Sequence, residues 1–299
     1  GILIIVSVGV VDDVRTLSAK IKLPFQLLAA SCVVFSGTNI GLITNPFSAT
    51  RVTELPPYIS YPLTILWIVG ITNAINLLDG LDGLAAGVSS IASLSLFFVA
   101  VINQQYGIAI IIVALAGSTL GFLPYNFNPA KIFMGDTGAT FLGFTLGVIS
   151  IQGLLKQYAA IAIAIPLLVL GLPLFDTLFA ILRRLVRGKS IMEADRGHLH
   201  HRLIDMGLSH KQSVVVMYTV SAALGLCAIV LADKGVLSAI ILVMTVSMFI
   251  IGGARYMSQI EDTEVEAMKP EEAVDVEEAE QPEEKASSNI VMKEVNDAK

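Results

Sequence analysis

The sequence predicts an all-α fold, a polytopic helical bundle integral to a membrane, and three observations lead to this prediction. Apolar residues make up 55% of the 299 residues and charged residues only 15%, whereas soluble domains carry about 25% charged residues. The apolar residues gather in runs of roughly 17–25 residues, the length at which a helix crosses a bilayer. The runs also lack the alternation of apolar and polar residues that marks a transmembrane β-barrel.

Eight apolar runs are long enough to span a membrane, and we expect each to form one transmembrane helix. The opening run, residues 1–11, starts at a glycine rather than a methionine, so we expect it to be the end of a ninth helix. The eight full runs cover about residues 24–44, 58–78, 84–102, 107–123, 137–153, 158–182, 213–231 and 235–254.

The basic residues predict the orientation of these helices. If every run crosses, the connections on one side hold twelve Lys and Arg residues up to Gln259, and those on the other side hold three. The positive-inside rule places the richer side in the cytoplasm. All four histidines and most acidic residues of the membrane part fall on that same side. We therefore expect one cytoplasmic site on a multi-pass protein of the plasma or inner membrane.

Charge also divides the chain into two predicted regions. Residues 1–258 are expected to form the membrane-embedded domain. The segment from Glu261 to Lys299 holds 14 acidic and 4 basic residues and no aromatic residue. Such a segment cannot bury enough apolar surface to fold, so residues 259–299 are expected to be a disordered cytoplasmic tail. A docking or regulatory role for the tail stays open.

Two pairs of carboxylates stand at the ends of apolar runs. Asp12 and Asp13 follow the first run, and Asp79 and Asp82, each followed by a glycine, follow the run 58–78. Charges at a membrane boundary are costly unless they are solvated, paired or bound to a cation. A plain helix end or a short polar hairpin would explain each pair alone.

Two amides precede the second pair of carboxylates inside an otherwise apolar run. Asn73 and Asn76 are three residues apart and therefore lie near one face of a helix. A polar hairpin does not explain them. Amide and carboxylate oxygens are hard donors suited to Mg²⁺, so the two amides and the following acids predict a cation site.

A third motif lies where the helix over 137–153 is expected to begin. Asp136 stands between glycines, so it is a candidate cation ligand or simply a helix cap. The free N–H groups of that helix end would also suit a phosphate. Asn126 and Phe133 belong to the same motif, and Phe133 is either a surface on which a base stacks or a packing residue.

A fourth motif, residues 195–202, lies in the largest predicted cytoplasmic loop. Histidines and arginines together suit phosphate binding, because Arg forms bidentate contacts with phosphate oxygens. A zinc site is the less favoured alternative, since no cysteine accompanies the histidines, and a merely positive loop would leave the histidines unexplained. The residues in question are His198, His200, His201 and Arg202, with Arg184 upstream.

The four motifs, in this order, resemble those of the polyprenyl-phosphate N-acetylhexosamine-1-phosphate transferases, within glycosyltransferase family 4. The resemblance runs from residue 6 to about residue 250. Family members have ten or eleven membrane helices, which implies about eleven in the intact protein. The His-x-His-His-Arg form resembles the undecaprenyl-phosphate GlcNAc-1-phosphate branch. The branch that transfers phospho-MurNAc-pentapeptide tends to have three consecutive histidines and stays an alternative.

The resemblance implies a Mg²⁺-dependent transfer of GlcNAc-1-phosphate from UDP-GlcNAc to undecaprenyl phosphate, with Mn²⁺ as a substitute metal. The implied metal ligands are Asp136, Asn76 and Asp79. The implied catalytic residues are Asp12, Asp13, Asp79, Asp82, Asp136, His198, His200 and His201. The residues implied to bind the nucleotide and its phosphates are Asn73, Asn126, Phe133, Arg184 and Arg202. The implied partners are the two substrates, the bilayer and a second copy of the chain, with no nucleic acid.

One position departs from the family pattern. Three residues after Asp13 the family often has Asp or Lys, whereas this chain has Thr16. Either a neighbour such as Arg15 or Lys20 supplies that contact, or the position is not essential. A transporter that uses intramembrane acids is an alternative from another class, but the acids here gather on one predicted side instead of being distributed through the bilayer.

Overall fold

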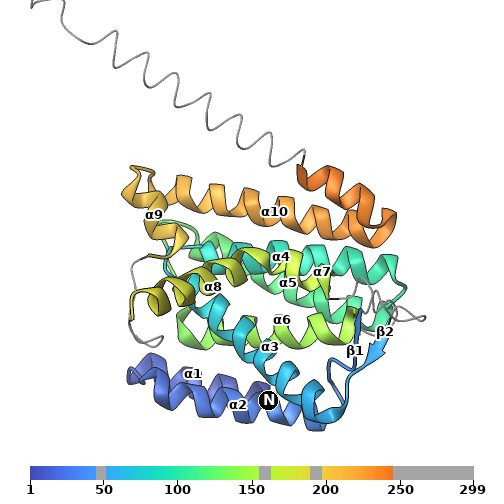
Figure 1. Cartoon of the computed structure of the whole chain (residues 1–299). Helices are drawn as coiled ribbons and strands as arrows, with labels where there is room; N and C mark the ends of the chain where they lie inside the picture. Colours follow the sequence, from blue (N-terminus) through green and yellow to red (C-terminus); the bar gives the residue numbers. More distant parts are fainter. Residues whose placement is uncertain (45–51, 155–162, 189–196, 245–299) are drawn as a thin grey trace, which may run out of the picture. The chain divides into compact units, whose positions relative to one another are not determined.

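The computed structural model describes residues 1–44, 52–154, 163–188 and 197–244, and these residues are mostly helical (Figure 1). Four of the described helices, α3, α4, α5 and α10, are long and apolar enough to cross a membrane. A further helical stretch covers residues 236–244. The elements in chain order are α1 (Ile2–Val14), α2 (Ala19–Phe35), β1 (Leu42–Thr44), β2 (Val52–Glu54), α3 (Pro57–Leu78), α4 (Leu84–Ile102), α5 (Tyr106–Asn126), α6 (Gly135–Leu154), α7 (Ala164–Val169), α8 (Gly171–Val186), α9 (Leu199–Asp205) and α10 (His210–Lys234).

Two expected helices are interrupted. The run 24–44 does not form one helix, because α2 ends at Phe35 and Gly37 adopts a left-handed φ of +94°. Leu42–Thr44 instead pairs antiparallel with Val52–Glu54 as a short hairpin. The run 158–182 is divided at Leu170 into α7 and α8. Pro173 explains this break, since proline lacks an N–H and clashes with the carbonyl four residues before it.

Several other expectations fall outside the described residues or stay predictions. The acidic tail, most of the run 235–254, and Asp195 and Arg196 of the histidine motif lie outside the described residues. The total of eight full spans and the division at residue 258 stay predictions.

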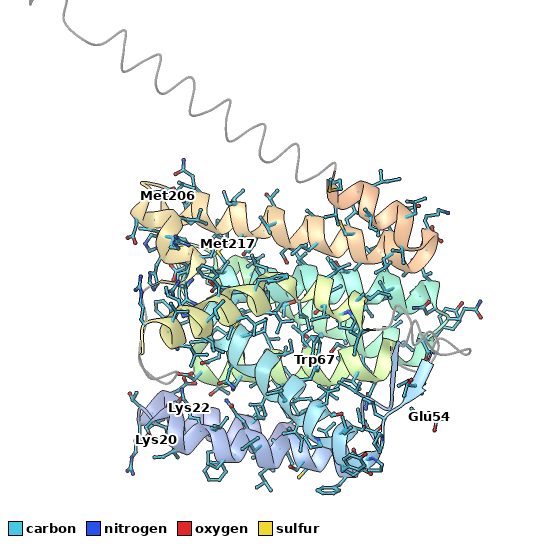
Figure 2. All side chains as sticks on the ribbon, viewed as in Figure 1. Lys20, Lys22, Glu54, Trp67, Met206 and Met217 are labelled. Atoms are coloured by element: carbon cyan, nitrogen blue, oxygen red, sulfur yellow. The ribbon has the colours of Figure 1, made fainter. Side chains whose placement is uncertain are left out.

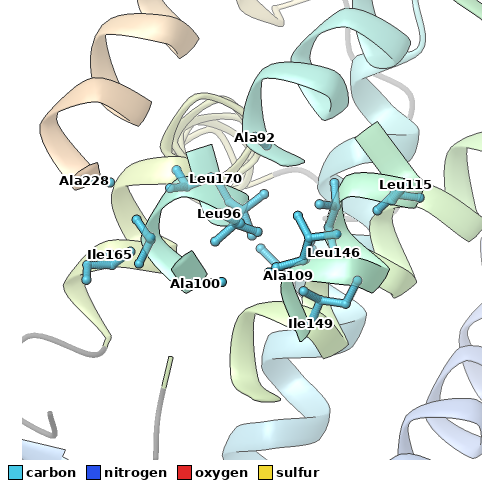
Figure 3. Packing of buried hydrophobic residues seen from close by; sticks show 14 of the residues in the cluster. Ala92, Leu96, Ala100, Ala109, Leu115, Leu146, Ile149, Ile165, Leu170 and Ala228 are labelled. Atoms are coloured by element: carbon cyan, nitrogen blue, oxygen red, sulfur yellow. The ribbon is translucent and has the colours of Figure 1, made fainter. Parts of the chain in front are cut away.

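The largest buried apolar cluster lies where α4 meets α5, α6, α7 and α10 (Figure 3). Small residues along α4, such as Ala92 and Ala100, let neighbouring helices approach closely. Glycines serve the same purpose elsewhere. A Cβ on Gly143 of α6 would lie 2.7 Å from Cα of Thr72 in α3, and one on Gly9 of α1 would lie 2.5 Å from Cα of Thr137 in α6.

The alternating directions of the helices bring four helix ends together. The C-terminal ends of α1 and α3 meet the N-terminal ends of α2 and α6, because α1 packs on α2 and α6, and α3 packs on α2 and α6. Figure 2 shows Lys20 and Lys22 at this end of the helices and Glu54, in the hairpin, at the other. The polar motifs predicted to lie on one side of a membrane are therefore gathered at one end of the helices.

Candidate active site

Asp136 lies at the centre of the polar cluster formed by these four helix ends. It is in the first turn of α6, and its Oδ1 accepts hydrogen bonds from Nδ2 of Asn76 at 2.7 Å and from Nζ of Lys22 at 3.2 Å. Two of the implied metal ligands, Asp136 and Asn76, are thus in contact, and their metal-binding role stays a prediction. Because Nδ2 of Asn76 donates to Asp136, its amide oxygen is the atom left for another ligand.

Lys22 connects Asp136 to the first carboxylate motif. Its Nζ lies 2.6 Å from Oδ2 of Asp12, whose Oδ1 accepts from the backbone N–H of Leu17 at 2.6 Å. The side chains of Arg15 and Lys20 are exposed, whereas Lys22 reaches the carboxylates of Asp12 and Asp136. Which neighbour supplies the missing family contact stays a prediction.

Asp13 caps the helix that carries Asp136. Its carboxylate accepts hydrogen bonds from the backbone N–H groups of Asp136 at 2.7 Å and Thr137 at 3.2 Å, and from Oγ1 of Thr137 at 2.5 Å. Two features of the sequence permit this contact. Gly9, one turn before Asp13, lets α1 approach α6, and Gly135 adopts a positive φ of +68° beside the Asp13 carboxylate. A carboxylate at a helix N-terminus is stabilised by the helix dipole.

Asp79 differs from the other carboxylates of the cluster. It follows the last residue of α3, and within the described residues its side chain has no hydrogen-bond partner. Burial raises the pKa of Asp79 to about 7, and the negative charges of Asp136, Asp13 and Asp82 raise it further in the same direction. A cation bound beside Asp79 would oppose this shift, because it would favour the ionised carboxylate.

Asn73 and Asp82 stand beside the cluster, held by protein contacts. Nδ2 of Asn73 donates to Oε1 of Gln26 at 2.7 Å, which ties α3 to α2. Oδ2 of Asp82 accepts from Nδ2 of Asn128 and from the backbone N–H of Ala130, both at 3.0 Å. These contacts give both residues a part in positioning the polar loops, and their predicted catalytic and nucleotide-binding roles stay predictions.

Asn126 is buried, and both ends of its amide make a hydrogen bond. It accepts from the backbone N–H of Gly83 at 3.1 Å and donates to the carbonyl of Ile132 at 3.0 Å. The same loop presents Phe133 with 75% of its surface exposed. The ring is thus accessible to a ligand, and its role in stacking on a base stays a prediction.

Two side chains of α8 hold the start of the histidine motif. Asp176 accepts from the backbone N–H of Leu199 at 2.8 Å through Oδ1, and its Oδ2 lies 2.9 Å from Nδ1 of His198. Two turns of helix further along, Nη1 of Arg183 donates to the carbonyl of Gly197 at 2.8 Å. Three consecutive residues, 197 to 199, are therefore fixed to α8.

The motif also reaches the end of α3. A Cβ on Gly80 would lie 2.5 Å from Nε2 of His200, so the His200 ring rests directly on this glycine, next to Asp79. The rings of His198 and His200 are parallel with centroids 5.9 Å apart, and His201 lies 4.2 Å from His200. The histidines are thereby brought beside the carboxylate cluster, as the motifs predicted.

Burial lowers the pKa of His200 to about 4, and the neighbouring His201 and His198 lower it further while Asp176 opposes the shift. His200 is therefore neutral at neutral pH. Arg184 is buried, and the guanidinium of Arg202 lies 6.0 Å from the Phe179 ring centroid.

A groove of about 510 Å³ adjoins the histidine motif along α8. Most of its wall is apolar, and Asp176 and Arg202 are its charged members. Its other lining residues are Leu172, Phe175, Leu178, Phe179, Leu182, Gly197 and Leu199.

Three residues of this arrangement were not singled out as site residues in the sequence: Lys22, Gln26 and Asp176. Asp176 had a recognisable signal, because an acid inside an apolar run is costly and marks a functional candidate. The signal for Gln26 was similar but weaker. Lys22 could not be distinguished from Lys20 before the start of α2 was known.

Known proteins resemble this chain over most of its length. The model of glycosyl transferase family 4 matches residues 1–154. The probable undecaprenyl-phosphate N-acetylglucosaminyl 1-phosphate transferase of Bacillus subtilis is 44% identical over 249 residues, which are 83% of this chain and 69% of the relative. Decaprenyl-phosphate N-acetylglucosaminephosphotransferase of Mycolicibacterium smegmatis is 36% identical, over 72% of this chain and 58% of the relative. A phospho-N-acetylmuramoyl-pentapeptide-transferase of Halalkalibacterium halodurans is 35% identical, over 72% of this chain and 65% of the relative.

Proposed function

Because this chain belongs to glycosyl transferase family 4, we propose that it transfers N-acetylglucosamine 1-phosphate from UDP-GlcNAc to undecaprenyl phosphate. The products would be UMP and the lipid-linked diphospho-sugar with which a cell-envelope polysaccharide or teichoic acid begins. The name of the B. subtilis relative supports both the lipid and the transferred sugar. The observation that carries the proposal is the meeting of Asp136, Asn76, Asp79 and Lys22 at the ends of apolar helices.

The proposed reaction joins two phosphates. An oxygen of the lipid phosphate attacks the phosphorus that carries the sugar, and the bond from that phosphorus to the bridging oxygen breaks, so that UMP leaves with that oxygen. A lipid phosphate is mostly ionised near neutral pH, since its second pKa is about 6. Positioning is therefore the main requirement. Lys22, held by Asp12 at 2.6 Å, supplies a positive charge for the lipid phosphate.

The oxygen donors of α3 and α6 fit Mg²⁺. Asp136 and Asp79 offer carboxylates, and Asn76 offers its amide oxygen. The described residues contain no group of three His, Cys, Asp or Glu side chains placed to hold a metal. Mg²⁺ does not require such a group, since it is commonly held by one or two carboxylates together with substrate phosphates. When bound, Mg²⁺ or Mn²⁺ would neutralise charge on the diphosphate.

The remaining polar residues suit the nucleotide and the sugar. Phe133, being exposed beside the cluster, is proposed to stack on the uracil ring. Arg184 and the three histidines of the motif, of which His200 adjoins Gly80, are proposed to hold the diphosphate and the sugar. Asn126 would act on the nucleotide through the loop that it shapes, because its own amide is engaged.

The membrane is proposed to deliver the lipid substrate. The apolar groove along α8 has Arg202 among its lining residues, a charge suited to a lipid phosphate, and leucine and phenylalanine walls suited to a prenyl chain. The predicted orientation, with this end in the cytoplasm, would give UDP-GlcNAc access from the same side. A homodimer stays among the proposed partners.

The test uses the full-length protein that contains this chain, in membranes, with radiolabelled UDP-GlcNAc, undecaprenyl phosphate and Mg²⁺. Labelled lipid that is lost with EDTA or with Asp136→Asn, and retained with Asp233→Asn, would support the proposal. Asp233 is a matched control because it is an exposed acid paired with Lys234 at the end of α10. Product from UDP-MurNAc-pentapeptide alone would assign the alternative branch. No product from either UDP-sugar would refute the transferase.

A further inference from the structure

Asp176 is an acid that the proposed reaction does not yet use. It lies in α8, within a run that is otherwise apolar, and only 7% of its side chain is exposed. A buried carboxylate costs several kcal/mol unless its charge and its oxygens are satisfied. Asp176 meets this condition with two partners from the histidine motif, the backbone N–H of Leu199 and Nδ1 of His198.

The two contacts differ in what they require of Asp176. The bond from Leu199 satisfies one of the free N–H groups at the start of α9 and needs only an oxygen acceptor. The contact with His198 depends on the carboxylate, which only accepts hydrogen bonds. The ring nitrogen that faces it, Nδ1, must therefore carry a proton, whether the imidazole is neutral or charged. Nε2 then becomes the ring atom that can exchange a proton or a hydrogen bond with a ligand.

The position of the His198 ring affects the rest of the motif. His198 is 96% buried, with 4% of its surface exposed, and its ring is parallel to that of His200, which rests on Gly80 beside Asp79. Arg183 fixes Gly197 from the same helix. A change in the His198 ring would therefore be transmitted through packed groups to the end of α3.

We propose that Asp176 is a positioning residue of this site, which fixes the Nδ1–H form and the orientation of His198 so that Nε2 of His198 acts on the sugar nucleotide. The proposal rests on the proposed function for its ligand. The Asp176–His198 geometry is independent of the proposed function, because it can be measured without turnover.

The decisive variant is Asp176→Asn. The amide oxygen can still accept from Leu199, but the amide nitrogen then faces Nδ1 of His198 and donates to it, which moves the histidine proton to Nε2. In a serine-protease triad the same substitution lowers kcat about 10⁴-fold for this reason. Here we expect kcat to fall about 100-fold, the effect of a misplaced substrate-binding group, with the KM for undecaprenyl phosphate changed less than threefold.

The control variant is Thr177→Val, next to Asp176 on the same helix. Oγ1 of Thr177 is buried and, within the described residues, has no hydrogen-bond partner. Replacing it with a methyl group of similar size tests whether any polar change in this part of α8 reduces activity. We expect kcat and KM to stay within about twofold of the wild-type values.

The second readout is the ¹⁵N NMR spectrum of the histidine rings in the full-length protein in detergent, with His198 assigned through His198→Gln. Nδ1 of His198 should give a protonated signal in the wild type and an unprotonated signal in Asp176→Asn. Asp176→Glu, which keeps the carboxylate, should retain the protonated signal and recover part of the activity.

Three results would overturn the proposal. The first is an unchanged His198 ring signal in Asp176→Asn, whatever the activity. The second is a wild-type kcat in that variant. The third is a raised KM for undecaprenyl phosphate with kcat unchanged, which would assign Asp176 to the lipid groove instead. If the wild-type protein transfers no sugar phosphate from any UDP-sugar, the proposed function fails, and the NMR result still decides the Asp176–His198 pair.

Discussion

The contact between Gly80 and His200 allows a direct test of how the histidine motif is attached to the carboxylate cluster. The perturbation is Gly80→Ala, which adds one methyl group. The φ of Gly80 lies outside the left-handed region, so an alanine fits the backbone. The added Cβ would lie 2.5 Å from Nε2 of His200, whereas ordinary van der Waals contacts begin at 3.4 Å. The ring or the glycine must therefore move by about 0.9 Å, the difference between these two distances.

A shift of this size is expected to be costly. His200 is 1% exposed and packs against His198 and His201, so its ring has little free space into which to move. A misplacement of about 1 Å in a site of this kind can reduce the rate about 100-fold. We therefore expect Gly80→Ala to lower kcat/KM by about two orders of magnitude, a loss of about 3 kcal/mol in transition-state stabilisation.

The assay is the transfer of radiolabelled GlcNAc-phosphate to undecaprenyl phosphate. Gly117→Ala in α5 is the matched control, because nothing lies within 4 Å of its added Cβ, and it should keep wild-type activity. If the clash is the cause, the double variant Gly80→Ala/His200→Ala should be no less active than His200→Ala alone. Activity of Gly80→Ala within about threefold of the wild type would show that His200 does not rest on this glycine.

Three further outcomes are expected. Asp13→Ala removes the cap of α6 and should lower stability by about 0.5–2 kcal/mol in thermal unfolding, whereas a loss as large in Asp13→Asn would contradict a capping role. The pKa of His200 is about 4 in the folded protein and 6.5 in the unfolded chain, so the unfolded chain binds the proton first as the pH falls. The free energy of unfolding should therefore decrease by about 3 kcal/mol from above pH 6.5 to pH 4. His200→Gln should abolish this decrease, as measured by thermal unfolding at each pH. Lys22→Met should reduce activity about 10-fold or more, and the exposed Lys20→Met should not.

Much of the helical structure was predictable because hydropathy measures what burial in a bilayer requires. The runs 58–78, 84–102 and 213–231 correspond to α3, α4 and α10 with ends displaced by at most three residues. Hydropathy does not register backbone conformation. For this reason it missed the end of α2 before Gly37, which has a positive φ, and the break before Pro173.

The candidate site was predictable in its composition and less so in its contacts. The family resemblance implied that Asp136 and Asn76 bind one metal, and in the structure the two side chains are hydrogen-bonded at 2.7 Å. The choice of Lys22 over Lys20 depends on the helical register of α2, which the sequence alone does not define. Asp176 was counted as part of a membrane span, and its function became visible only when α8 was placed beside the histidine motif.

The carboxylates of the cluster are chemically distinct despite their similar sequence contexts. Asp13 binds the N–H groups at the start of α6, Asp12 pairs with Lys22, and Asp136 accepts from Asn76 and Lys22. Each of these three is stabilised as an anion by donors that the fold supplies. Asp79 has no such donor within the described residues and is the acid whose pKa burial and its neighbours raise to about 7. The network therefore holds three charges in place, and the proposal that Asp79 is a metal ligand beside Asp136 implies that metal binding and substrate phosphate would be coupled at this position.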